Sequence, residues 1–140
     1  MEIPKTEQIP LFNNGHWDFH RQMGDLKYVG FIYVIRDDYN FYLGKKHYKA
    51  GNWKNYSSSS NLLKEIFEEV GKESFKFYCI AEYETVGQLS YAETWSLCFL
   101  ETPTRKTCLN RLIPKVSWKV PMRIPKSHKE RLLSVVSSFL

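Results

Sequence analysis

The chain has few of the features that define membrane, secreted or disulfide-rich proteins. No apolar run reaches the roughly 18 residues of a membrane-spanning helix, and the first residues lack the basic and apolar regions of a secretory signal. The three cysteines, at 79, 98 and 108, are odd in number and form no C-x-x-C pair, so neither a disulfide framework nor a zinc knuckle is expected. We therefore expect a protein of the reducing cytoplasm with no membrane partner.

Length and composition narrow the class further. The 140 residues are too few for two full domains, and a content of 43% hydrophobic and 16% aromatic residues excludes disordered and fibrous classes. Positive charge is in excess, because 20 lysines and arginines outnumber 15 aspartates and glutamates and give a net charge of +5. Such a surplus attracts polyanions, so nucleic acid is the first partner to consider.

Two runs rich in β-branched and aromatic residues, 28–35 and 40–44, predict the strands of a β-hairpin. The polar residues between them are typical of a turn. A turn centred on Asp38 and Tyr39 sets the pairing of the two strands. Ile35 then faces Tyr42, and every other pair follows from that register.

The same register places Tyr33 opposite Gly44 and makes Tyr33 and Tyr42 diagonal neighbours on one face, close enough to share a ligand. Lys46 joins that face by strand parity if the second strand continues. Gly44 is expected to leave open space above the face, so two phenols and an ammonium would surround a gap. The alternative is that both tyrosines simply pack in the core, as most strand tyrosines do.

The downstream pattern predicts a helix at 61–70, a strand at 75–83 and a helix at 86–100 that begins with a capping box at Thr85. A last short helix, capped by Ser127, follows the prolines of the C-terminal part. These elements predict an α/β (α+β) fold in which a three-stranded antiparallel sheet is flanked by helices.

Three segments are expected along the chain. Residues 1–27 contain prolines and glycines and predict an N-terminal arm, and residues 28–111 contain the predicted strands and the two main helices. Residues 112–140 are expected to form a basic C-terminal extension ending in the short helix. One domain, 28–111, therefore carries the candidate site.

One carboxylate lies among apolar positions of the predicted helix 86–100. Glu93 is four residues from both Leu89 and Leu97, on the ridge that should face the core. Burying an unpaired charge is costly, so the sequence implies a partner, which is a cation, a metal ion or a proton held by a raised pKa. A salt bridge to a lysine or arginine and a metal site both remain open at this point.

These pieces, in this order, resemble the GIY-YIG endonuclease superfamily, which is named after two strand motifs about ten residues apart. The triplets here are Phe-Ile-Tyr at 31–33 and Tyr-Leu-Gly at 42–44, with Gly30 one place earlier than the first glycine of the family. Glu93 stands where the family has a metal-binding glutamate, and Asn110 stands where an asparagine usually closes the domain. The detailed pattern looks like that of small, freestanding bacteriophage members.

The resemblance implies a metal-dependent DNA endonuclease that hydrolyses phosphodiester bonds, in an infected bacterial cell if the chain is phage-encoded. Tyr33 would be the general base that activates water, and Tyr42 would hydrogen-bond a phosphate oxygen or the water. Glu93 would hold one Mg²⁺, or Mn²⁺ in its place. A lysine near Tyr33 is expected, because the pKa of a free tyrosine is near 10 and a base must be deprotonated.

The chain departs from the family at the catalytic arginine that usually follows the second motif, because no arginine occurs between positions 36 and 105. Lys46 is the first candidate to replace it, Lys45 the second and Lys54 a more distant one, although lysine lacks the bidentate fork of arginine. His47 is a candidate for an additional phosphate donor or proton shuttle.

Two basic stretches are candidates for contacts with nucleic acid, mostly to phosphate. The predicted contacts are Lys45, Lys46, Lys54, Arg105, Lys106 and Arg111. Two other functions are open on the same residues: a GIY-YIG-fold DNA-binding protein that has lost catalysis with the arginine, and a single-strand or RNA-binding module that stacks bases on aromatic side chains.

Overall fold

The computed structural model describes residues 27–50, 60–110, 113–114 and 122–140. Three strands form one antiparallel sheet in the order β2-β1-β3, so the α+β prediction is confirmed. The elements in chain order are β1 (Gly30–Arg36), β2 (Phe41–His47), η3 (Tyr48–Ala50), α1 (Asn61–Val70), η4 (Lys72–Ser74), β3 (Lys76–Tyr83), α2 (Val86–Phe99), η5 (Thr102–Thr104), α3 (Lys126–Val136) and η6 (Ser137–Phe139).

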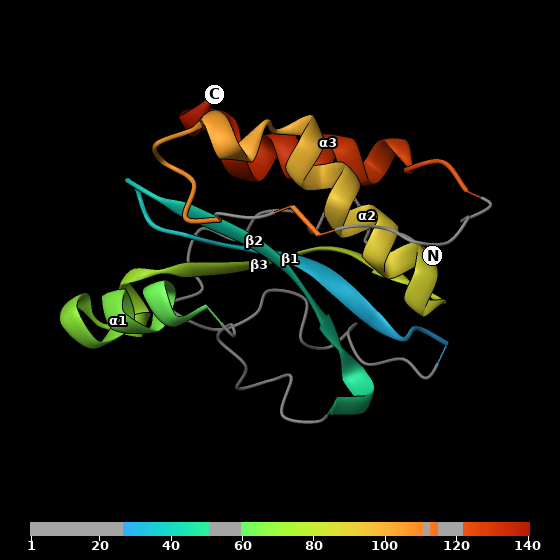
Figure 1. Cartoon of the computed structure of the whole chain (residues 1–140), viewed down its shortest axis with the longest axis horizontal. Helices are drawn as coiled ribbons and strands as arrows, with labels where there is room; N and C mark the ends of the chain where they lie inside the picture. The colour runs from blue at the N-terminus through green and yellow to red at the C-terminus, as the bar shows by residue number, and fades with distance from the viewer. Residues whose placement is uncertain (1–26, 51–59, 111–112, 115–121) are drawn as a thin grey trace.

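The sheet separates two hydrophobic layers, with α2 and α3 on one face and α1 on the other (Figure 1). Alternation along β1 produces this division, because Ile32 and Val34 point towards α2 and α3 while Phe31, Tyr33 and Ile35 point towards α1. We call the side of the sheet that carries Ile32 and Val34 the α2 face, and the opposite side the α1 face. All five side chains are almost completely buried, since β1 is the central strand.

The predicted hairpin register is confirmed. Tyr33 pairs with Gly44 and Ile35 pairs with Tyr42. The turn is closed by Asp37, whose Oδ1 accepts the backbone N–H groups of Tyr39 and Asn40 at 2.8 and 2.7 Å. The second strand is longer than the run at 40–44 predicts and continues to His47, so the parity argument applies to Lys45 and Lys46.

The helix limits follow from caps at two helices and from packing at the third. Thr85 Oγ1 accepts the N–H of Gln88 at 3.1 Å, as the capping box predicts, and α1 ends at Gly71, whose φ of 89° suits glycine. The prediction of a Ser127 cap is wrong, because α3 already begins at Lys126 behind Pro125 and has no side-chain cap. Burial of its apolar side chains, rather than a cap, holds this helix in place.

Helix α3, which lies in the predicted extension 112–140, packs on the same core as the sheet. Arg131 is buried, and its Nε donates to the carbonyl oxygen of Cys79 at 2.6 Å. That carbonyl lies where the register between β1 and β3 shifts, since Ile32 pairs with Ala81 but Tyr33 pairs with Cys79. The arginine therefore joins α3 to the irregular part of the sheet.

A buried histidine links three elements of the α2 face. His128 of α3 contacts Tyr83 Oη at 2.8 Å through Nδ1 and Ser96 Oγ at 2.7 Å through Nε2. Ser96 donates its own proton to the Ala92 carbonyl, so its oxygen accepts from Nε2–H, and Nδ1 accepts from Tyr83. This pairing assigns one neutral tautomer to the ring. Burial lowers the pKa of His128 from its usual 6.5 to about 3.

We expect this histidine to make folding pH-dependent. The unfolded chain binds a proton at His128 below its usual pKa of 6.5, whereas the folded chain does not until about pH 3. The contribution of the neutral His128 to the free energy of unfolding is therefore fully present above pH 6.5. It is lost as the pH falls, by about 2 kcal/mol between pH 7.5 and pH 5. Urea unfolding at both pH values measures this change. A His128→Gln variant is less stable but should lack this part of the slope, and an unchanged slope contradicts the expectation.

Candidate active site

The two motif tyrosines meet on the α1 face. The rings of Tyr33 and Tyr42 are stacked, with centroids 6.3 Å apart and planes inclined by 29°. The predicted open space above Gly44 is not there, because the Tyr33 ring fills it. A Cβ on Gly44 would lie 2.5 Å from Tyr33 Oη and 2.7 Å from Cζ. Glycine at this position therefore lets the phenol of Tyr33 lie directly on the edge strand β2.

The burial of the two rings differs. Tyr33 is 1% exposed, whereas Tyr42 is only partly buried at the margin of the same cluster. A ligand approaching this face would therefore reach Tyr42 first, and contact with the hydroxyl of Tyr33 requires its neighbours to rearrange. Lys46 pairs with Phe31 and so lies on this face, as strand parity predicts.

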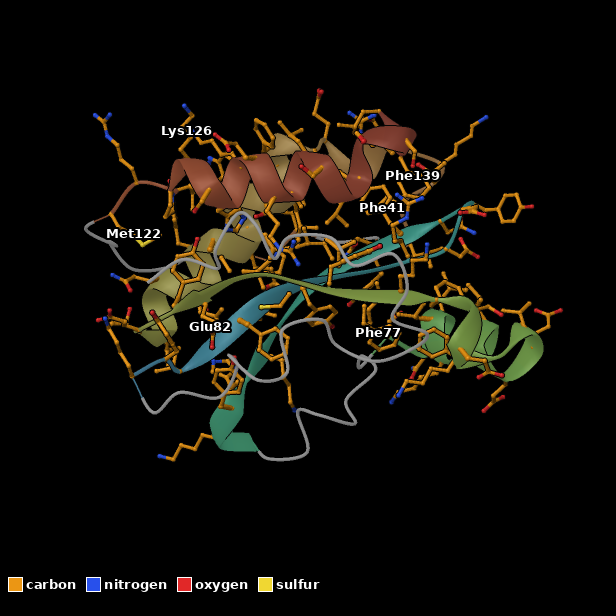
Figure 2. All side chains as sticks on the ribbon, turned by 180° about the vertical axis from the view of Figure 1, so that it is seen from behind. Phe41, Phe77, Glu82, Met122, Lys126 and Phe139 are labelled. Atoms are coloured by element: carbon orange, nitrogen blue, oxygen red, sulfur yellow. The ribbon has the colours of Figure 1, made fainter. Side chains whose placement is uncertain are left out.

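The α1 face also holds a carboxylate that sequence reasoning missed. Glu82 is buried and projects from β3 away from α3, as Figure 2 shows. Its Oε2 accepts the hydroxyl of Tyr48, in η3, at 2.5 Å. Glu82 and Lys46 pair with Phe31 from opposite sides, so the three residues form one row across the sheet. The signal in the sequence was a single acidic residue within the otherwise apolar end of the strand at 75–83.

Glu93 lies on the other face of the sheet. Helix α2 packs on the α2 face, and the carboxylate Oε1 of Glu93 is 3.3 Å from Nζ of Lys45. The side chains are 12% and 27% exposed, respectively. Of the partners that the sequence left open for Glu93, a lysine is thus in place. Lys45 and Lys46 are adjacent in β2, and alternation directs one to Glu93 and the other to the tyrosine face.

His47 lies beyond the two lysines, at the end of β2. It pairs with Gly30 and shares its strand parity with Lys45. Partial burial lowers the pKa of His47 below its usual 6.5, and the nearby charges of Lys45 and Lys46 lower it further. The ring is therefore neutral at pH 7, so it adds no positive charge to the site and is able to accept a proton.

Asn110 is joined to the outer edge of β2. Its Oδ1 accepts the N–H of Leu43 at 2.9 Å, and its Nδ2 donates to the Leu43 carbonyl at 2.8 Å. Two residues earlier in the strand, the N–H of Phe41 donates to the Thr107 carbonyl at 2.9 Å, and the Phe41 carbonyl accepts the N–H of Leu109 at 2.8 Å. This segment therefore covers the edge of β2 as far as Leu43. The next residue whose backbone N–H and C=O point to this outer edge is Lys45, two residues after Leu43 and about 6.6 Å further along the strand.

A polar cavity of about 410 Å³ opens beside Asn110. It contains the predicted phosphate contacts Arg105 and Lys106, and Arg105 is held by a hydrogen bond from Nε to the Leu100 carbonyl at 2.5 Å. The residues that line it are uncharged or basic: Thr102, Pro103, Thr104, Arg105, Lys106 and Asn110. Two further predicted contacts, Lys54 and Arg111, lie outside the described residues.

The described residues fit a magnesium ion held by a single carboxylate. They contain no group of three histidine, cysteine, aspartate or glutamate side chains that could enclose a metal. Mg²⁺, however, is commonly held by one or two carboxylates and otherwise by water and substrate phosphate oxygens. Glu93, with its partly exposed carboxylate at the edge of the sheet, meets that requirement.

The site therefore has two halves on either side of β2. Tyr33, Tyr42 and Lys46 occupy the α1 face, while Glu93, Lys45 and His47 belong to the α2 face. β2 is an edge strand of the sheet, and the two halves lie on its opposite faces.

Comparison with known proteins identifies the family of the chain. Residues 16–109 match the family described as "Putative endonuclease segE, GIY-YIG domain". The match spans most of the chain, so the chain belongs to the GIY-YIG endonuclease superfamily. Neither the search of curated proteins nor the search of solved structures gave a match. Within the described ranges, no helix has the length and apolar character needed to cross a bilayer.

Proposed function

We propose that this protein is a metal-dependent endonuclease that hydrolyses phosphodiester bonds of DNA. One observation carries the proposal: the phenols of Tyr33 and Tyr42 stack over Gly44 on an edge strand whose other side holds Glu93. Membership of a nuclease family supports the reaction class. The net charge of +5 and the lysines of β2 suit a polyanionic substrate.

The phosphate would bind at the outer edge of β2, beside Gly44 and Lys45. Once the neighbours of the buried Tyr33 ring have rearranged, Tyr33 would accept the proton of the attacking water, and Tyr42 would donate a hydrogen bond to a phosphate oxygen. Lys46 lies on the tyrosine face and would balance the negative charge that develops on the phosphate. Its charge would also favour the phenolate form of Tyr33.

Glu93 would hold a divalent ion, Mg²⁺ or Mn²⁺. When bound, this ion supplies Lewis-acid stabilisation of the leaving oxygen. The carboxylate is positioned by α2, whose buried Leu89 and Leu97 hold that ridge of the helix against the sheet. Water and phosphate oxygens would complete the coordination of the ion once Lys45, now 3.3 Å from the carboxylate, moves away.

Contacts that position the DNA would come from both basic stretches. Arg105 and Lys106 line the cavity beside Asn110, and Lys45 follows Leu43 on the same edge of β2, so all three would contact phosphates of the DNA backbone. Lys54 and Arg111 are proposed as further phosphate contacts on the basis of sequence alone. His47 is proposed as an auxiliary proton acceptor. We place the activity in the cytoplasm of a bacterial cell, infected if the chain is phage-encoded.

Tyr33→Phe tests the proposed base. Loss of the hydroxyl should lower the cleavage rate about 10²-fold, the lower end of what a general base contributes. The assay is nicking of supercoiled plasmid and of branched DNA with Mg²⁺, with EDTA added in parallel. Tyr39→Phe, at an exposed turn, is the matched control and should cleave normally. If both variants cleave like the wild type, Tyr33 is not the base.

A second function is favoured by one observation. Glu93 already has a lysine partner, and the sheet lies between it and Tyr33. A DNA-binding protein of the same fold without catalysis would be expected to retain such a pair as a purely structural contact. The same plasmid assay separates the two functions: retention of the DNA in a gel with Mg²⁺ but no nicks supports the binding protein. In a module for single strands or RNA, Tyr33→Ala would lower affinity rather than rate.

A further inference from the structure

Glu93 has a cation at the position where the proposed metal would bind. Nζ of Lys45 lies 3.3 Å from Oε1 of Glu93, and the carboxylate side chain is only 12% exposed. Leu89 and Leu97, one turn away on either side, are buried. A carboxylate in these surroundings needs a positive partner in every state of the protein.

We propose that Lys45 is a built-in counter-ion that occupies the cation position of Glu93 in the metal-free protein and is displaced when a divalent ion binds. The inference rests on the proposed role of Glu93 as a metal ligand. It assigns Lys45 as a positioning residue with two states: paired with Glu93 before metal binding, and released from it afterwards.

The side chain of Lys45 is suited to such an exchange. It is 27% exposed and lies on the edge strand, so its ammonium can leave Glu93 for water without being buried unpaired. A lysine has a flexible stem and a single compact charge, whereas an arginine at this position would hold the carboxylate with two parallel hydrogen bonds. A released ammonium at the edge of β2 would also lie where the phosphate is proposed to bind.

The exchange makes a measurable prediction about metal affinity. A metal that binds the wild type must displace the ammonium, so its apparent affinity is reduced by the strength of the ion pair. Removing the charge with Lys45→Met should therefore tighten binding of Mn²⁺ about five-fold, the equivalent of a partly exposed ion pair. The neighbouring Lys46→Met removes the same charge from the opposite face and is the matched control.

The experiment is a titration of the full chain with Mn²⁺ at low ionic strength, without DNA, followed by paramagnetic broadening of the amide signals around Glu93. Tighter binding by Lys45→Met but not by Lys46→Met supports the proposal. Unchanged or weaker binding by Lys45→Met overturns it. A Glu93→Gln variant tests the metal-ligand role of Glu93 separately from the counter-ion role of Lys45. If the broadening is lost in this variant, Glu93 is the metal ligand, whatever the result for the Lys45 variants. If Glu93→Gln binds Mn²⁺ like the wild type, the proposed metal site itself fails.

A second variant covers the case in which Lys45→Met does not fold. Lys45→Arg keeps the charge and is expected to fold, and it should bind Mn²⁺ at least about two-fold more weakly than the wild type, because a guanidinium holds the carboxylate more tightly. Equal or tighter binding by Lys45→Arg overturns the counter-ion role. A second readout is thermal unfolding: Mn²⁺ should raise the Tm of Lys45→Met more than that of the wild type.

Discussion

Replacing Glu93 with alanine is expected to lower Mg²⁺-dependent cleavage about 10⁴-fold, because a metal ion contributes several kcal/mol to stabilisation of the transition state. Glu93 is the only acidic side chain of α2, and the described part of the chain holds no group of three potential metal ligands that could take its place. Binding of DNA should persist, since most phosphate contacts come from lysines and arginines elsewhere.

The measurement is the single-turnover nicking rate with Mg²⁺, together with the affinity for the same DNA in EDTA. Glu84→Ala is the matched control, because Glu84 forms an exposed pair with Lys27 and should not affect the rate. Circular dichroism checks that Glu93→Ala folds with Lys45 left unpaired. A variant that cleaves at the wild-type rate would exclude Glu93 as the metal ligand.

Gly44→Ala is expected to be the most damaging single-methyl change at the site. The added Cβ would lie 2.5 Å from the hydroxyl of Tyr33, and that ring is buried and stacked on Tyr42, so it cannot move without repacking the α1 face. We expect unfolding stability to fall by about 2 kcal/mol, as in other overpacked cores. Cleavage should fall about 10³-fold, which exceeds the loss for Tyr33→Phe because the whole ring is displaced.

A double-mutant cycle separates this effect from general destabilisation. Once the hydroxyl has been removed by Tyr33→Phe, adding Gly44→Ala should cost less activity than it does in the wild type, because both changes act through the same ring. Rates are compared under conditions where each variant is fully folded, as judged by urea titration. Additive losses would mean that Gly44 does not act through Tyr33.

Much of the local structure follows from the sequence. The hairpin register, the Thr85 cap and the stop at Gly71 depend on contacts between near neighbours, so they are predictable from turn and capping rules. Strand parity likewise places Lys46 with Tyr33. The Ser127 cap was predicted by the same kind of rule and is wrong, because packing of α3 on the core sets its start.

The candidate site was predictable only in part. Glu93 was expected to need a partner, but its lysine was not identified as Lys45, since that requires knowing which face of the sheet α2 covers. Glu82 was missed because the sequence does not show whether an acidic residue in a strand is buried and paired, and its partner Tyr48 is known only from the structure. The space above Gly44 was misjudged because parity gives the face of a side chain but not the direction in which its ring leans.

The sequence by itself indicated the family through the resemblance of its two strand motifs and of Glu93. It also determined the three strands, the main helices and the face on which each strand residue lies, because these depend on hydrophobic periodicity and on local hydrogen bonds. Only the tertiary structure decided that α2 and α3 share one face, that Lys45 neutralises Glu93, and that the sheet separates Glu93 from Tyr33. The physical reason is that the face of the sheet on which α2 packs is set by long-range contacts between the helix and the sheet. Turn, capping and periodicity rules act over short ranges and do not specify that face.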